Sequence, residues 1–78
     1  MPTILRIGAY RFFFYSNEKG EPHHIHVQQE RKLAKFWLQP VALASCSGFS
    51  APELRKLSEL VQEHQPIFTE AWNGFFGA

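Results

Sequence analysis

The chain has 78 residues, which is enough for one domain, and its single cysteine excludes a disulfide framework within the chain. The net charge is only +1, yet residues 1–48 carry six Lys or Arg against three Glu, whereas residues 49–78 carry two against four. Such an excess is also ordinary scatter for a small domain, but it makes the first part the preferred side for an anionic partner. No apolar run is long enough to span a bilayer and no signal-peptide pattern is visible, so we expect a cytoplasmic protein without membrane contacts.

Strand signals fill the first part of the chain, as runs of β-branched and aromatic residues bounded by turn formers. The predicted strands are Thr3–Ile7, Tyr10–Ser16, His24–Gln28 and Lys32–Leu38, with a short edge segment at Val41–Ala44 after Pro40. Gly8 and Ala9 suit a two-residue hairpin turn between the first two strands. The sequence therefore predicts about four strands joined by short connections.

The pattern changes to helical spacing at Phe49. Ser50 and Glu53 fit a capping box, and Pro66 should stop or kink the helix that follows. A second helical segment, roughly Pro66–Phe76, can end on Gly77 in a left-handed cap. We expect one domain over residues 1–78, of α+β class: residues 1–48 form a small antiparallel sheet, and residues 49–78 form one kinked or two short helices on one face of it.

Strand alternation assigns the side chains to the two faces of this sheet. Ile25 and Val27 should face the helices, which places His24 and His26 on the open face. Arginine and lysine are costly to bury without a partner, so the strand positions that hold them should face outward as well. The open face is then expected to collect Arg11, Phe13, Tyr15, His24, His26, Lys35 and Trp37.

Such a face has two chemical uses and one structural explanation. Aromatic rings stack on unpaired bases while cations hold phosphates, which makes candidate nucleic-acid-binding residues of Arg11, Phe13, Tyr15, Lys35 and Trp37. Alternatively, a metal-independent ribonuclease would use His24 or His26 as general base or acid, with Arg11 and Lys35 stabilising charge on a phosphorane. Structurally, aromatic residues on a small sheet are commonly core or interface, and alternate histidines are commonly the polar side of a strand.

Other chemistries lack the residues that they need. His24 and His26 supply two metal ligands where a structural zinc site almost always has four, so we predict no metal and no cofactor. The chain contains no Asp, which removes a Ser-His-Asp triad, and no Gly-rich phosphate loop is present. Cys46 beside Gly48 is a conceivable nucleophile, but a free, partly buried thiol is far more common. No helix-turn-helix pattern with basic recognition residues indicates a DNA-binding regulator.

Five stretches resemble a family of short bacterial proteins that is catalogued as a domain of unknown function: 2–4, 11–18, 24–27, 34–38 and 70–73. Members of that family are commonly encoded beside a second small protein, in what looks like a type II toxin–antitoxin module. The resemblance covers essentially the whole chain. It implies a toxin-like protein that a cognate protein antitoxin holds inactive and that acts on RNA or a ribosome-associated target.

The family's polar positions correspond here to Arg11, Tyr15, Asn17, Glu18, His24, His26 and Lys35. One departure is the stretch Ser45–Phe49, which is often Asn-rich in relatives. The alternative to a toxin-like protein belongs to a different class. The chain would then be a non-enzymatic interaction domain, whose aromatic face is the contact with a partner protein or with a second copy in a homodimer.

Overall fold

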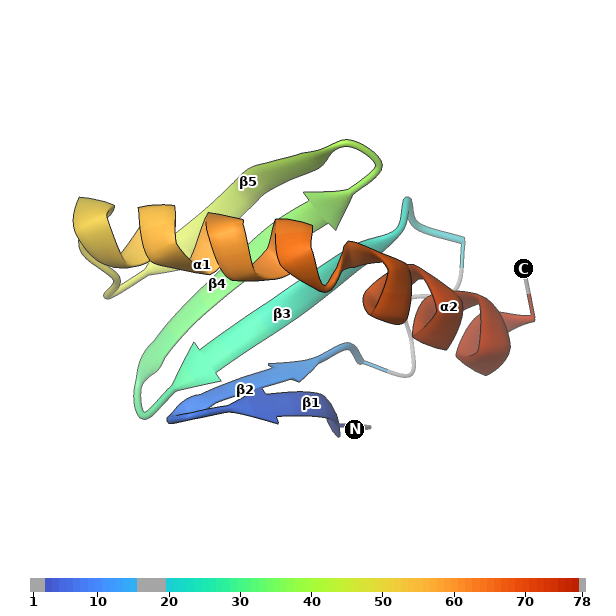
Figure 1. The fold of residues 1–78 in the computed structure, drawn as a ribbon, viewed down its shortest axis with the longest axis horizontal. Helices are drawn as coiled ribbons and strands as arrows, with labels where there is room; N and C mark the ends of the chain where they lie inside the picture. Colours follow the sequence, from blue (N-terminus) through green and yellow to red (C-terminus); the bar gives the residue numbers. More distant parts are fainter. Residues whose placement is uncertain (1–2, 16–19, 78) are drawn as a thin grey trace.

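The computed structural model describes residues 3–15 and 20–77 of the chain. Within these ranges, five strands come first and two helices follow (Figure 1). The elements are β1 (Thr3–Ile7), β2 (Tyr10–Phe13), β3 (His24–Gln29), β4 (Lys32–Leu38), β5 (Val41–Ser47), α1 (Ala51–Glu63) and α2 (Gln65–Phe76). The expected α+β class is confirmed, with five described strands where the sequence predicted about four.

The strands form one antiparallel sheet in which each strand pairs with the next along the chain, in the order β1-β2-β3-β4-β5. Short turns suffice for such a meander, and Gly8 adopts a φ of 58° in the turn between β1 and β2. Both helices lie on the same side of the sheet (Figure 1). The first of them packs against β4 and β5, and α2 continues toward the end of the sheet where β3 begins.

The helix ends follow the sequence signals closely. The Ser50 hydroxyl accepts from the Glu53 N–H at 3.3 Å, and the Glu53 carboxylate accepts from the Ser50 N–H at 2.9 Å, which is the predicted capping box. Pro66 stands in the first turn of a new helix, so the described chain has two helices rather than one kinked helix. Gly77 closes α2 with a φ of 72°, as expected for a left-handed cap.

The core lies between the sheet and the two helices. Alternate strand residues point into it, and Phe12 of β2 stacks on Phe68 of α2 with ring centroids 5.2 Å apart. A fully buried aromatic or aliphatic side chain of this kind stabilises the fold by about 1.5–3 kcal/mol. The alternation predicted for the strands is confirmed by the cluster of Phe12, Phe14, Ile25, Val27, Ala34, Phe36, Leu38, Phe49, Leu57, Val61, Phe68 and Trp72.

Three strand boundaries differ from the expectation. β3 ends at Gln29, one residue after the predicted Gln28. β5 continues to Ser47, well beyond Ala44, because its pairing with β4 extends to the Leu33–Ser47 position. Backbone pairing here overrides the weak strand preference of small polar side chains. β2 ends at Phe13, where its last pair with β3 joins Phe13 to His26. The predicted end of that strand at Ser16 lies outside the described residues.

Candidate functional site

The register of the sheet brings the predicted site residues together on the face opposite the core. Phe13 pairs with His26, His26 pairs with Lys35, and His24 pairs with Trp37, on three neighbouring strands. Residues directly opposite in neighbouring antiparallel strands lie on the same face. Tyr15 follows β2 and joins the group, since its ring lies 4.8 Å from that of His26. The aromatic face is the set Arg11, Phe13, Tyr15, His24, His26, Lys35 and Trp37.

At one side of the aromatic face, Arg11 is oriented by three contacts, the first of them a 3.5 Å hydrogen bond from Nη1 to Thr3 Oγ1. Its Nη2 donates to Gln28 Oε1 at 2.7 Å, and its Cζ lies 4.3 Å from the centre of the Phe13 ring. Phe13 in turn stacks on His26, with centroids 5.4 Å apart and planes at 25°. The guanidinium is therefore fixed above an aromatic column rather than extended into solvent.

Lys35 is held in a similar way on the other strand that flanks β3. Its Nζ lies 4.6 Å from the Trp37 ring centre and 3.5 Å from Glu21 Oε1. Each flanking strand thus places one cation against an aromatic ring, with the two histidines of β3 between them. This arrangement provides positive charge and flat apolar surface side by side, which is the combination that single-stranded nucleic acids contact.

His24 departs from the expectation that it is open to a ligand, because its side chain is completely buried. Its ring lies 4.8 Å from Trp72 of α2 and 5.9 Å from Trp37, so it connects the core to the aromatic face. His24 Nδ1 lies 2.8 Å from the Pro22 carbonyl oxygen. A carbonyl only accepts, so this nitrogen carries the proton.

The second histidine is also covered, since His26 is 7% exposed and Phe13 is 1% exposed. Stacking explains this burial: the rings of Phe13, Tyr15 and His26 cover one another. The predicted face of the sheet is therefore correct for these side chains, but they are less exposed to solvent than expected. Among the aromatic face, Tyr15 is the large apolar side chain that reaches solvent most.

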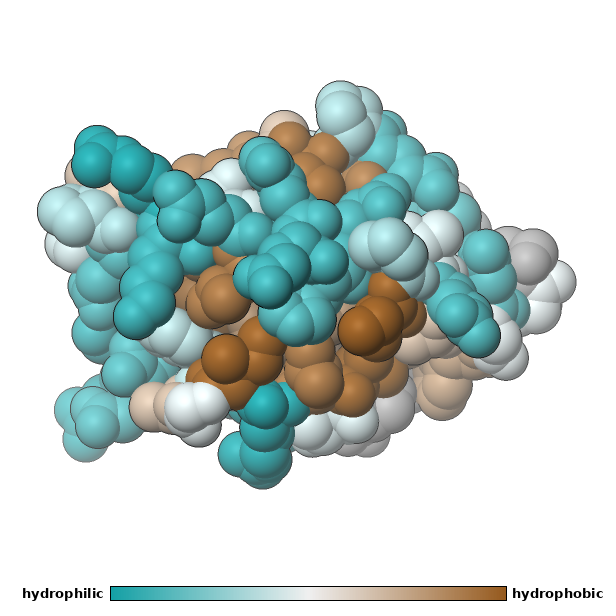
Figure 2. All heavy atoms as spheres, viewed as in Figure 1, coloured by the Kyte–Doolittle hydropathy of each residue, from teal (hydrophilic) through white to brown (hydrophobic). Residues whose placement is uncertain are grey.

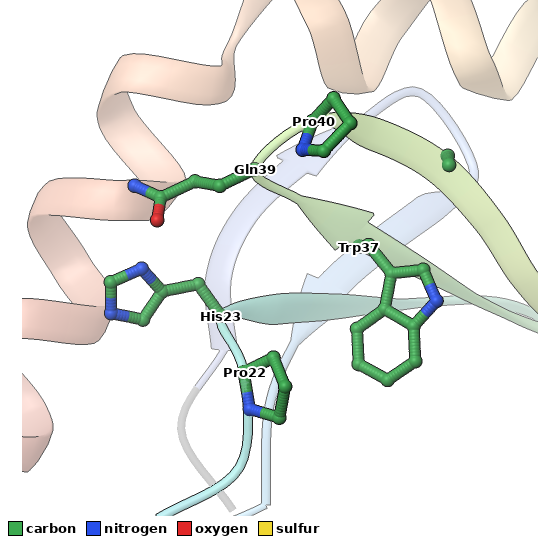
Figure 3. Close-up of a pocket in the computed structure, with 6 residues that line it drawn as sticks. Pro22, His23, Trp37, Gln39 and Pro40 are labelled. Carbon is green, nitrogen blue, oxygen red and sulfur yellow. The ribbon is translucent and has the colours of Figure 1, made fainter.

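A cleft of about 380 Å³ opens at the end of the aromatic face, where β3 begins and β4 turns into β5. Figure 3 shows the Trp37 indole on one side and the Pro22 ring next to it, with Pro40 at the turn, while the side chains of His23 and Gln39 extend away from the indole. Ala42 completes the lining. Of these six residues, Trp37 is the one predicted from the sequence as a site residue. The remaining residues come from loop and strand ends, where the available signal was two prolines that mark turns.

A second lysine–glutamate pair has a structural position on the helix side. Lys32 Nζ lies 2.7 Å from Glu53 Oε2 and joins β4 to the first turn of α1. The hydrogen bond from Lys32, together with those from Ser50, lowers the pKa of Glu53 from 4.5 to about 2. The same hydrogen bond raises the pKa of Lys32. This pair therefore stays ionised at neutral pH and secures the start of α1.

The described residues lack two further kinds of site, a metal cluster and a membrane-spanning helix. In residues 3–15 and 20–77, no three His, Cys, Asp or Glu side chains come close enough to hold a metal ion. Neither α1 nor α2, the helices of that part of the chain, is long and apolar enough to cross a membrane. Cys46 is exposed on β5, where it pairs with Ala34 of β4.

Comparison with known proteins identifies a family. A family model described as "Domain of unknown function (DUF4160)" matches residues 9–73, a range that contains every residue of the aromatic face and of the cleft. Searches of the curated proteins and of the solved structures found no match. Because the family model covers far more than half of the sequence, the chain belongs to the DUF4160 family of domains of unknown function.

Proposed function

We propose that the chain is the toxin-like component of a toxin–antitoxin pair and that it acts by binding single-stranded RNA through the aromatic face. The resemblance to proteins encoded in such gene pairs motivates the toxin role. The RNA-binding role is supported by one structural observation above all. Arg11 and Lys35 are held at 4.3 and 4.6 Å from the centres of the Phe13 and Trp37 rings, one on each strand beside β3.

This geometry suits a flexible anionic strand. Base stacking on an exposed ring contributes about 1–3 kcal/mol per base, and it needs no particular base because every base has a flat face. Tyr15, which follows β2, and Trp37 of β4 offer such rings on the two sides of β3. Gln28 orients the guanidinium of Arg11 before any ligand arrives, which reduces the conformational entropy lost on binding.

Binding is better supported than cleavage. A metal-independent ribonuclease needs an imidazole within hydrogen-bond reach of the ribose 2′-hydroxyl. His24 is completely buried with its Nδ1 directed at the Pro22 carbonyl, and His26 is covered by two aromatic rings. We therefore assign His24 and His26 to the support of the aromatic surface, with Arg11 and Lys35 as its phosphate contacts.

The test measures binding of the full chain to a fluorescent single-stranded RNA over a series of salt concentrations. The double variant Arg11→Gln with Lys35→Gln should bind more weakly, and the slope of log affinity against log salt should fall by about 0.7 for each phosphate contact that is lost. Lys56→Gln is the matched control, since it removes an exposed cation from α1 on the other side of the molecule. Equal losses in both proteins, or no binding by the wild type, would sink the proposed interface.

The toxin role has a separate test in growing cells. Expression of the chain without its partner should slow growth, and the same double variant should relieve the effect while the unfolding midpoint stays near that of the wild type. Co-expression of the cognate protein antitoxin should also restore growth. A wild-type chain with no effect on growth argues against a toxin whether or not RNA binds.

One observation favours a second candidate, a protein-interaction or homodimerisation domain. On the helix side, α2 leaves Ile67 49% exposed and Phe75 46% exposed, and a groove of about 510 Å³ separates Ile67 from Ile4 of β1. Figure 2 shows apolar surface beside the helices in this view. Substituting Ile67 and Phe75 by Ser should abolish self-association in the dimer reading, and it should leave RNA affinity unchanged if the aromatic face binds RNA.

A further inference from the structure

The cleft beside Trp37 has the size and lining of a small-molecule site. Its volume of about 380 Å³ lies within the range of about 300–1,000 Å³ that is typical of ligand pockets. Trp37, Pro22, Pro40 and Ala42 give it mostly apolar walls. Such sites generally combine apolar walls with a few polar groups that fix the ligand's orientation.

The walls favour a flat ligand. In Figure 3 the Trp37 indole stands on one side of the cleft, and the ring of Pro22 stands across from it. Both are rigid rings, so a planar heterocycle can enter between them with little loss of side-chain entropy. A sugar or an aliphatic chain would fill the space between two such rings less well.

Two polar side chains can read the edge of that heterocycle. Gln39 carries an amide with one acceptor and two donor hydrogens, and His23 carries two ring nitrogens. The His23 ring is positioned by Trp72 of α2, at a centroid distance of 5.5 Å. Amide and imidazole groups pair with the donors and acceptors on the edges of unpaired bases.

A cation stands beside the cleft, on the side of the aromatic face. Lys35 Nζ lies 4.6 Å from the centre of the same indole that lines the cleft. The Lys35 side chain is 23% exposed, and its partner Glu21 lies at 3.5 Å and is 47% exposed, so a phosphate oxygen can replace the carboxylate at the ammonium. Aromatic wall, polar edge and cation together match a nucleotide: base, base edge and phosphate.

We propose that this cleft binds one unpaired nucleobase of the RNA strand and thereby gives the chain a base preference. The proposal rests on the RNA-binding function above, because it assigns the base contact to the site whose phosphate contacts are Arg11 and Lys35. The base stacks on Trp37, its edge meets Gln39 and His23, and its phosphate lies at Lys35. Base identity is read at this position, while the rest of the strand is held without preference.

The direct test follows the indole N–H signal of Trp37 by NMR while the full chain is titrated with AMP, GMP, CMP or UMP. Trp37→Phe assigns that signal, since Trp72 supplies the other indole. At least one nucleotide should shift the signal in a saturable way, and ribose 5-phosphate, which lacks a base, should not. If no nucleotide shifts it, or if ribose 5-phosphate shifts it equally, the base pocket is refuted.

A cleft-filling variant supplies the structural control. Ala42→Leu adds an apolar side chain to the lining from β5 and should weaken nucleotide binding at least tenfold. Ser47→Leu adds the same side chain to the same strand and sheet face, opposite Leu33 and outside the cleft, and should bind as the wild type does. Unchanged binding by Ala42→Leu, with unfolding midpoints alike in all three proteins, would overturn the assignment.

The same proteins separate this proposal from the one on which it rests. One comparison uses an RNA with an abasic site at every position. If it binds the wild type as tightly as the RNA with its bases does, the phosphate-binding face is supported and the base pocket is refuted. If mononucleotides bind the chain but RNA does not, the base pocket is supported and the RNA-binding function is refuted. If Ala42→Leu loses both mononucleotide binding and RNA binding while Ser47→Leu keeps both, the two proposals are supported together.

Discussion

Phe12 and Phe13 are neighbours in β2 and both are almost completely buried, at 0% and 1% exposure, but on opposite faces of the sheet. Phe12 stacks on Phe68 of α2, so another layer of the fold covers it. Phe13 is contacted by the guanidinium of Arg11 and by the rings of His26 and Tyr15, all from its own face. The comparison shows how a small sheet can bury aromatic rings on both faces, under helices on one face and under its own neighbouring side chains on the other.

The largest expected effect comes from truncating these two residues. Phe12→Ala should reduce the free energy of unfolding by about 3–5 kcal/mol, because the rings of a packed core cannot close the cavity. Phe13→Ala should cost less, on the order of 1–3 kcal/mol, since the surface side chains around it can rearrange over the gap. Urea unfolding with a constant slope measures both values. Equal losses would mean that the aromatic face is a second core and no separate surface.

His24 contacts both the core and the aromatic face, and its substitution is expected to have the next largest effect on the free energy of unfolding. His24→Leu removes the 2.8 Å bond to the Pro22 carbonyl and should destabilise the fold by about 1–3 kcal/mol. His24→Asn keeps a donor near the Nδ1 position and should recover part of that loss. The measurement is the urea midpoint of the three proteins. If the leucine variant is as stable as the wild type, the bond from His24 to the Pro22 carbonyl does not stabilise the fold.

Particular residues show which parts of the fold local sequence patterns predict. The strand Lys32–Leu38 and the cap at Ser50 followed from local patterns, because pairing period and capping depend on near neighbours along the chain. The extension of β5 to Ser47 did not, since long-range pairing with β4 decides it. Local signals thus predicted the elements, and strand pairing set some of their ends.

The candidate site shows the same limit. Alternation placed His24, His26 and Lys35 on one face, because a strand repeats every two residues. It gave no indication that Trp72 of α2 buries His24, or that Pro22, Trp37 and Pro40 meet around a cleft. Those contacts join segments that are distant in the sequence, so no local pattern records them.

The two lysine–glutamate pairs extend the comparison of the faces. On the helix side, Glu53 has its pKa lowered to about 2 by Lys32 and Ser50. Its carboxylate therefore stabilises the fold fully above the ordinary value of 4.5, and the contribution is lost as the pH falls from there toward 2. Glu53→Gln should flatten this part of the curve of unfolding free energy against pH.

The measurement is urea unfolding at a series of pH values between 7 and 2. Glu59→Gln is the matched control, because it removes an exposed carboxylate from α1 away from Ser50 and Lys32. The control should retain the acid-dependent loss of stability that the wild type shows. If Glu53→Gln and Glu59→Gln give the same curve, the Lys32–Glu53 pair does not stabilise the start of α1.

On the aromatic face, Glu21 should behave in the opposite way, with the smallest effect on stability. Its pair with Lys35 is 3.5 Å long and partly exposed, so Glu21→Gln should change the free energy of unfolding by about 1 kcal/mol or less. The neutral side chain no longer competes with phosphate for the ammonium. RNA affinity should therefore rise, by up to about fivefold at low salt, and the gain should shrink as salt screens the charge. Lower affinity in this variant would show that Glu21 orients Lys35 for binding, and the two pairs would then have the same role on both faces.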